Sequence, residues 1–96
     1  MIALEQRAHP HPQVVDTELD EGEIVLLHLE SKIYFSLNPT GVRIWRGLKE
    51  GLHLKEISQR LQQEFDVAGD IADRSVLALV TELCKENLAL ADAKNS

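Results

Sequence analysis

The hydrophobic pattern of this chain changes at Asn38, inside the segment IYFSLNPTGVRIW. Residues 33–37 before it are mostly β-branched, aromatic or aliphatic and are typical of a strand. After it, Val42 and Trp45 recur at a three-residue step, as they would on one face of a helix. Asn38 is a good N-cap, and Pro39 suits the first helical position, where its missing N–H costs nothing. The chain therefore divides here into a strand-forming part and a helical part.

The strand-forming part contains three apolar runs, at residues 14–19, 23–29 and 33–37, separated by turn signals at 20–22 and 30–32. Two short connections between three runs favour an antiparallel meander. The middle run is apolar almost throughout, as expected of a central strand covered on both faces. The flanking runs are more mixed and are therefore predicted at the edges of the sheet.

The helical part contains three segments. The first ends at Gly51, and the second runs from about 54 to 65. The third is expected to start near Asp70, which can cap it, and to run to about Asn87. The segment LALAD after it either adds a short strand or frays. The predicted fold class is α+β: a winged-helix-like domain with a three-stranded antiparallel sheet followed by three helices.

The chain of 96 residues is long enough for a single domain, which we place at residues 14–92. Residues 1–13 are expected to form an irregular N-terminal arm, because the segment His-Pro-His-Pro at 9–12 is incompatible with a regular helix or a central strand. Residues 93–96 are expected to be a tail.

The third helix carries more apolar surface than one core contact requires. One stripe contains Val76, Leu79, Val80 and Leu83, and a second ridge beside it contains Leu77, Cys84 and Leu88. The apolar arc covers roughly half of the helix, against the ~100° that a single contact needs. Two interpretations stay open: the second ridge packs against the sheet or a partner subunit, or it lines an open groove.

Composition argues against several functional classes. Sixteen acidic and ten basic residues give a net charge of −6, which opposes binding to phosphate backbones. A single cysteine allows no internal disulfide and no multi-cysteine metal site. The N-terminal segment does not resemble a signal peptide, and no run approaches membrane-spanning length. These features predict a cytoplasmic protein without a membrane partner.

The sequence contains no pattern that is typical of an active site, so we expect no enzymatic activity, no metal and no cofactor. His9 and His11 lie in the expected arm, without a nearby cysteine or acidic partner. His28 is expected to be a satisfied or half-exposed strand residue, His53 a cap of the second helix, and Cys84 a small buried hydrophobe. A basic face formed by Arg43, Arg46 and Lys49 on the first helix is either a solvated surface or a docking patch for an acidic partner.

The segment IVLLHLESKIYFSLNPTGVRIWRGLKEG resembles the PqqD-like proteins, in which a strand of similar sequence leads into the first helix. The segments LKEISQRLQQEFDV and VLALVTELCKENLA match the second and third helices of that family, so the resemblance covers about residues 14–90. These proteins are RiPP recognition elements, which bind the leader segment of a ribosomally made precursor peptide. The chain looks most like the stand-alone first B-proteins of lasso peptide pathways.

The resemblance implies a binding site between the third strand and the third helix. In this family the leader adds as an extra strand to the third strand and packs on the third helix. The implied leader-binding residues are Lys32, Ile33, Tyr34, Phe35 and Ser36 on the strand, and Arg74, Leu77, Val80, Thr81 and Cys84 on the helix. A second row of the helix is the alternative: Ser75, Leu79 and Glu82. Strand alternation places Phe35 and Ile33 on one face and Tyr34 on the other.

The implied partners are a precursor leader peptide, a separate cysteine-protease-type leader peptidase and a cyclase. An open apolar edge also allows self-pairing into a homodimer. Phe35 stands where the family often has a second tyrosine or a small residue, so the groove here is expected to differ.

Two other functions are compatible with this fold. One is a pyrroloquinoline quinone-type peptide chaperone for a radical enzyme. The other is a small winged-helix DNA-binding protein, in which the third helix would enter the major groove. The charge of that helix opposes the second alternative, because the helix carries four acidic side chains and only two basic ones. We therefore expect no nucleic-acid partner.

Overall fold

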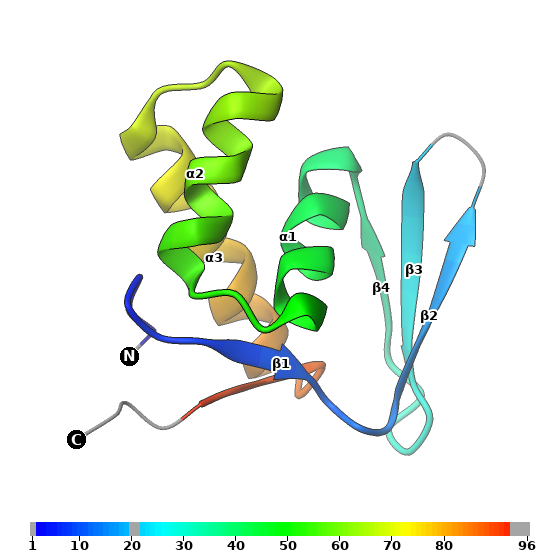
Figure 1. Cartoon of the computed structure of the whole chain (residues 1–96). Coiled ribbons are helices and arrows are strands. Elements are labelled where there is room, and N and C mark those ends of the chain that lie inside the picture. The colour runs from blue at the N-terminus through cyan, green and yellow to red at the C-terminus, as the bar shows by residue number, and fades with distance from the viewer. Residues whose placement is uncertain (1, 20–21, 93–96) are drawn as a thin grey trace.

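A computed structural model describes residues 2–19 and 22–92 and has the predicted order of three strands followed by three helices (Figure 1). The three-stranded sheet is antiparallel, with strand order β2-β3-β4. A second, two-stranded sheet pairs the two ends of the described chain. The elements are β1 (Ala8–Pro10), β2 (Val14–Leu19), β3 (Glu23–His28), β4 (Tyr34–Leu37), α1 (Pro39–Glu50), α2 (Leu54–Phe65), α3 (Gly69–Lys85) and β5 (Ala89–Ala91). The α+β prediction is confirmed.

The ends of α1 follow the predicted local rules. The Asn38 side chain accepts a hydrogen bond of 2.8 Å from the Gly41 N–H, and Pro39 occupies the first turn. Gly51 ends the helix with φ of 80°, a left-handed conformation that suits glycine. At the start of α2 the Glu56 carboxylate accepts from the His53 N–H at 2.9 Å, so His53 is the capping residue that we expected.

The third helix differs from the prediction at both ends. It begins at Gly69 after an Ala68 N-cap, so Asp70 is a first-turn residue that pairs with Arg74 at 3.5 Å and does not cap the helix. It ends at Lys85, two residues early, because Asn87 adopts a left-handed φ of 62°. That turn sends Leu88 into the core, where it is fully buried, and its N–H bonds to the Leu83 carbonyl at 2.8 Å.

The N-terminal segment is not the irregular arm that we expected. Strand β1 pairs antiparallel with β5, with Ala8 opposite Ala91 and Pro10 opposite Ala89. Pro10 is tolerated because it is the last residue of β1 in a two-stranded sheet. The outer edge of such a strand has no partner, so no N–H donor is needed there. The sequence LALAD therefore adds a strand, while the expected tail at 93–96 lies outside the described residues.

The arm is held in place by the first turn of α2, whose N–H groups have no helical acceptors. The Gln6 carbonyl accepts from Leu54 at 2.9 Å, and the Leu4 carbonyl accepts from Lys55 at 2.8 Å. Ala8 is buried in the core. In Figure 1 this segment runs beneath the helices, close to the lower end of α3.

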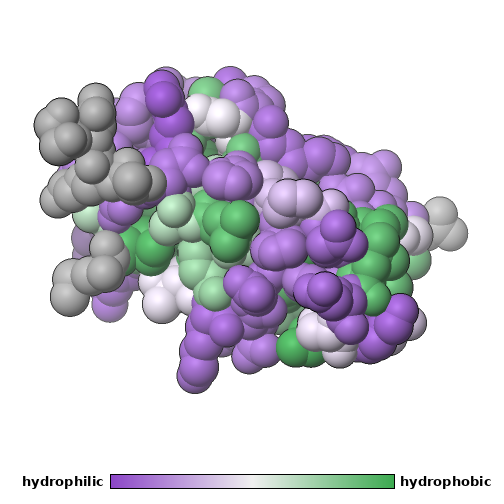
Figure 2. Space-filling view, turned by 90° about the horizontal axis from the view of Figure 1, so that it is seen from below, coloured by the Kyte–Doolittle hydropathy of each residue, from purple (hydrophilic) through white to green (hydrophobic). Residues whose placement is uncertain are grey.

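Strand β5 also explains part of the wide apolar face of α3. Leu77 and Cys84 are half-buried and pack against the periphery of the core. The Cys84 thiol interacts with the Ala91 backbone in β5, and burial raises its pKa. Strand β5 thus covers the Cys84 end of the second ridge. Seen from below, hydrophilic side chains occupy most of the surface, with hydrophobic ones gathered in smaller areas between them (Figure 2). Among the described helices, none is long and apolar enough to cross a membrane.

The sheet and α1 are joined through Asp16 of β2. Its carboxylate accepts from the indole N–H of buried Trp45 at 2.8 Å and from the Lys49 ammonium at 2.7 Å. Both bonds favour the ionised form, so Lys49 and then Trp45 hold the pKa of Asp16 below its ordinary value of 3.8.

This arrangement predicts a pH-dependent contribution to stability. Since the folded-state pKa of Asp16 is lowered, its contribution is present above about pH 4 and is lost as the pH falls through the folded-state value. We expect Asp16→Asn to lower the free energy of unfolding by about 1 kcal/mol at pH 7, because a charge-assisted acceptor becomes a neutral one. Urea unfolding of both proteins at pH 7 and pH 2.5 checks this. A difference between them that stays constant over this range would contradict it.

Candidate functional site: a groove beside strand β4

Strand β4 has an open edge. Within residues 2–19 and 22–92 its only paired neighbour is β3. The His28 N–H donates to the Ile33 carbonyl at 3.0 Å, which sets the alternation of bonded positions along this antiparallel pair. Phe35 and Leu37 accordingly direct their main-chain groups toward β3. The N–H and C=O groups of Tyr34 and Ser36 point the other way, to the open edge.

Side chains alternate along β4 as expected. Phe35 lies opposite buried Leu26 and is half-buried on the face that meets the helices. Tyr34 lies on the opposite face with 70% of its surface exposed. The predicted placement of Tyr34 and Phe35 on different faces is confirmed.

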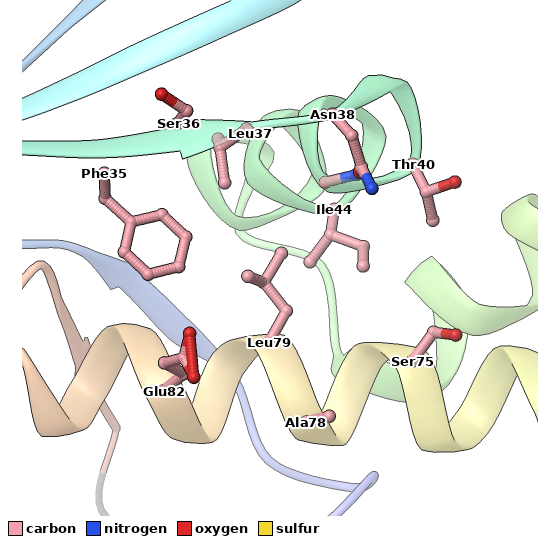
Figure 3. Close-up of a pocket in the computed structure, with 11 residues that line it drawn as sticks. Phe35, Ser36, Leu37, Asn38, Thr40, Ile44, Ser75, Ala78, Leu79 and Glu82 are labelled. Atoms are coloured by element: carbon pink, nitrogen blue, oxygen red, sulfur yellow. The ribbon is translucent and has the colours of Figure 1, made fainter.

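A groove of about 490 Å³ runs between β4 and α3, closed at one end by the start of α1 (Figure 3). Its middle is apolar, with Leu79 of α3 pointing toward Ile44 and Leu37. The described residues that line it are Phe35, Ser36, Leu37, Asn38, Thr40, Gly41 and Ile44 on one side, and Ser75, Ala78, Leu79 and Glu82 on the other.

The expected residues around β4 are only partly in this groove. Phe35 and Ser36 line it, and Tyr34 contributes its main chain to the adjoining edge. Lys32 and Ile33 precede the strand and do not line the groove. Lys32 instead forms part of the β3–β4 turn with a left-handed φ of 64°.

On α3 the groove wall is the second of the two rows considered. Ser75, Leu79 and Glu82 line the groove, whereas no residue of the first row does. Val80 is fully buried, and Leu77 and Cys84 face the core margin described above. The two remaining first-row residues, Arg74 and Thr81, are exposed outside the groove. The groove lining therefore contains the alternative row and not the row named first.

Sequence reasoning missed the groove residues at the start of α1, among them Thr40 and Ile44, and also Ala78 of α3. A usable signal was present. Ser75 and Ala78 are small side chains on one face of an otherwise bulky helix, and small residues leave room for another chain to approach.

The basic face of α1 is neutralised. Arg43 pairs with Glu64 at 2.6 Å, and Lys49 pairs with Asp16 at 2.7 Å. Arg46 pairs with Glu18. Each cation of this basic face thus already has an acidic neighbour in its own chain.

The histidines have structural partners as well. His9 pairs with Asp92 at 2.6 Å, and the rings of His11 and His28 lie 4.6 Å apart. Buried His28 accepts the Glu30 and Ser31 N–H groups at 3.2 Å through Nδ1, which fixes the turn before β4. Its buried Nε2 has no hydrogen-bond partner among the described residues, so His28 is neither half-exposed nor fully satisfied as expected. Among the described residues no cluster of three or more His, Cys, Asp or Glu side chains could hold a metal ion.

Comparison with known proteins places this geometry in a family. Residues 23–89, which include β3, β4 and all three helices, match the family model described as coenzyme PQQ synthesis protein D (PqqD). The chain belongs to the PqqD family. The resemblance seen in the sequence is thereby confirmed, and the fold is that of a PqqD-like RiPP recognition element. None of the curated protein sequences compared matches this chain.

Two solved structures are similar over nearly the whole chain. TbiB1 in complex with the TbiA(beta) leader peptide is 30% identical, with a TM-score of 0.79, and the match covers 92% of this chain and 99% of that one. A lasso peptide synthetase B1 complexed with the leader peptide is 32% identical, with a TM-score of 0.80, and the match covers 88% and 98%. Both PqqD-like structures therefore contain a peptide ligand.

Proposed function

We propose that this PqqD-family protein is a non-catalytic adaptor of lasso peptide biosynthesis. It binds the leader segment of a ribosomally synthesised precursor peptide and presents it to a separate leader peptidase. The observation that carries the proposal is the open edge of β4 beside a groove whose far wall is α3. The peptide complexes of the two similar B1 proteins support it.

Binding would follow the physics of strand addition. A guest strand pairs with the free main-chain groups of Tyr34 and Ser36, which supply affinity without regard to sequence. Every second guest side chain then points into the groove, where Phe35, Leu79 and Ile44 offer apolar contacts. Selectivity comes from those inward side chains.

Cleavage of the leader is assigned to another protein because the groove holds no paired nucleophile and base. Its lining contains hydroxyl groups but no histidine or cysteine. Cys84 faces β5, and burial raises its pKa, which lowers the fraction of reactive thiolate. The groove is thus suited to holding a peptide for a partner enzyme.

The proposal is tested with Tyr34→Pro. Proline removes the N–H that points to the open edge but no bond between β4 and β3, so the fold should persist. Peptides selected from a random 16-residue display library on the native protein provide the probe. We expect their affinity to fall at least tenfold with Tyr34→Pro, as measured by fluorescence anisotropy, while the melting temperature changes little.

Tyr34→Ala is the matched control, because it removes the exposed ring and keeps the N–H. Its affinity should stay within about threefold of the native value, on the scale of one exposed side-chain contact. Bound peptide should also slow hydrogen exchange at the Tyr34 and Ser36 amides. Unchanged affinity in a folded Tyr34→Pro protein, or no protection of these amides, would rule out strand addition at β4.

A further inference from the structure

We propose that Glu82 makes the groove selective for a guest strand that carries a lysine or arginine two residues away from an apolar side chain. The inference rests on the proposed function and assigns the chemistry of the peptide that the groove accepts. It depends on how polar and apolar groups are distributed along the groove.

The groove has two chemically different ends (Figure 3). Glu82 lies at the end occupied by Phe35, while Thr40, Asn38 and Ser75 lie at the other. Leu79 lies between them, facing Ile44 and Leu37. A guest strand therefore meets a carboxylate at one end, an aliphatic surface in the middle and neutral polar groups at the far end.

Glu82 is the only charged residue of the groove lining. It is exposed, and its carboxylate forms no ion pair or hydrogen bond with the residues that the structure describes. Other acids on α3 are already paired, Asp70 with Arg74 and Asp73 with Lys55, both at 3.5 Å. Glu82 is thus available to a cationic ligand in a groove that offers no competing cation of its own.

The spacing of strand side chains sets the pattern. Side chains on one face of a strand are about 6.7 Å apart, because each residue advances about 3.3 Å. From Ser75 to Glu82, α3 rises about 10.5 Å, so the groove accepts two inward side chains, or three at most. With one of them beside Glu82, the next falls on the surface formed by Leu79 and Ile44. A basic residue and an apolar residue are therefore expected at positions i and i+2.

The test is a selection from the random 16-residue peptide library on the native protein and on Glu82→Gln. We expect peptides from the native protein to be enriched in Lys or Arg two residues from an apolar residue, and this enrichment to disappear with Glu82→Gln. For a selected peptide, Glu82→Gln should weaken binding about threefold, in the range of an exposed ion pair. Replacing the peptide's basic residue by glutamine should remove that difference.

Asp70→Asn is the matched control, since it removes one carboxylate from the same helix outside the groove. It should leave both the enrichment and the affinity unchanged. Peptides that protect the Tyr34 and Ser36 amides but show no basic preference would overturn the role of Glu82 while leaving the proposed function intact. If no selected peptide protects those amides, both proposals fail.

Discussion

Leu79→Asp is expected to weaken peptide binding by roughly a hundredfold, the strongest effect of any single change in the groove. Leu79 forms the apolar middle of the groove from the α3 side. An inward guest side chain would lose a hydrophobic contact worth about 1.5–3 kcal/mol and would meet a carboxylate that must be dehydrated. A loss of about 3 kcal/mol corresponds to a factor of roughly one hundred.

The fold should survive this change because Leu79 is only partly buried. Thr81→Asp is the matched control, as it adds the same charge to the same helix at an exposed position outside the groove. Titration calorimetry with a library-selected peptide, together with thermal melts, separates binding from folding. Equal affinities of the two variants would show that peptides do not occupy this groove.

Gly47→Ala is expected to destabilise the protein by about 2 kcal/mol, although alanine is the better helix former. Gly47 lies in α1 against α2, where an added Cβ would lie 2.6 Å from Cγ1 and 2.8 Å from Cδ1 of Ile57. Ile57 is itself 1% exposed, so it has little room to move. Overpacking of this kind costs about 1–3 kcal/mol, which exceeds the helix-propensity gain of about 1 kcal/mol.

A double-mutant cycle isolates this contact. In an Ile57→Ala background the clash is absent, so Gly47→Ala should stabilise by about 1 kcal/mol through helix propensity. Gly69→Ala is a control for adding a methyl group, because its nearest neighbour is the end of the flexible Gln62 side chain at 3.3 Å. Additive effects in urea unfolding experiments would show that α1 and α2 adjust without strain.

Local rules predicted the boundaries of the elements well where one residue decides them. Asn38 and Gly51 bound α1 because a side-chain acceptor and a left-handed glycine act on their own neighbours. Asp70 was misassigned because Ala68 begins α3 without a side-chain cap, and no sequence signal marks such a start. The strand β1 was missed since its pairing partner lies about eighty residues away.

The groove likewise combines features that neighbouring residues decide with features that distant segments decide. Alternation along β4 correctly separated Tyr34 from Phe35, because the period of a strand is a property of its own backbone. Periodicity did not decide which row of α3 lines the groove, which is the alternative row of Ser75, Leu79 and Glu82. Both candidate rows of α3 contain apolar residues at helical spacing, so periodicity alone does not tell which row faces the core and which faces β4.

The amino-acid order alone thus decided the number, type and sequence of the main elements, the edge position of β4 and the family to which the chain belongs. Only the tertiary structure decided which face of α3 stays open. Strand β5 occupies the Cys84 side, whereas Ser75, Leu79 and Glu82 lie beside β4. The physical reason is that the apolar surface of a helix is buried by segments that are distant in sequence. The side of α3 that these segments do not cover stays accessible to a ligand.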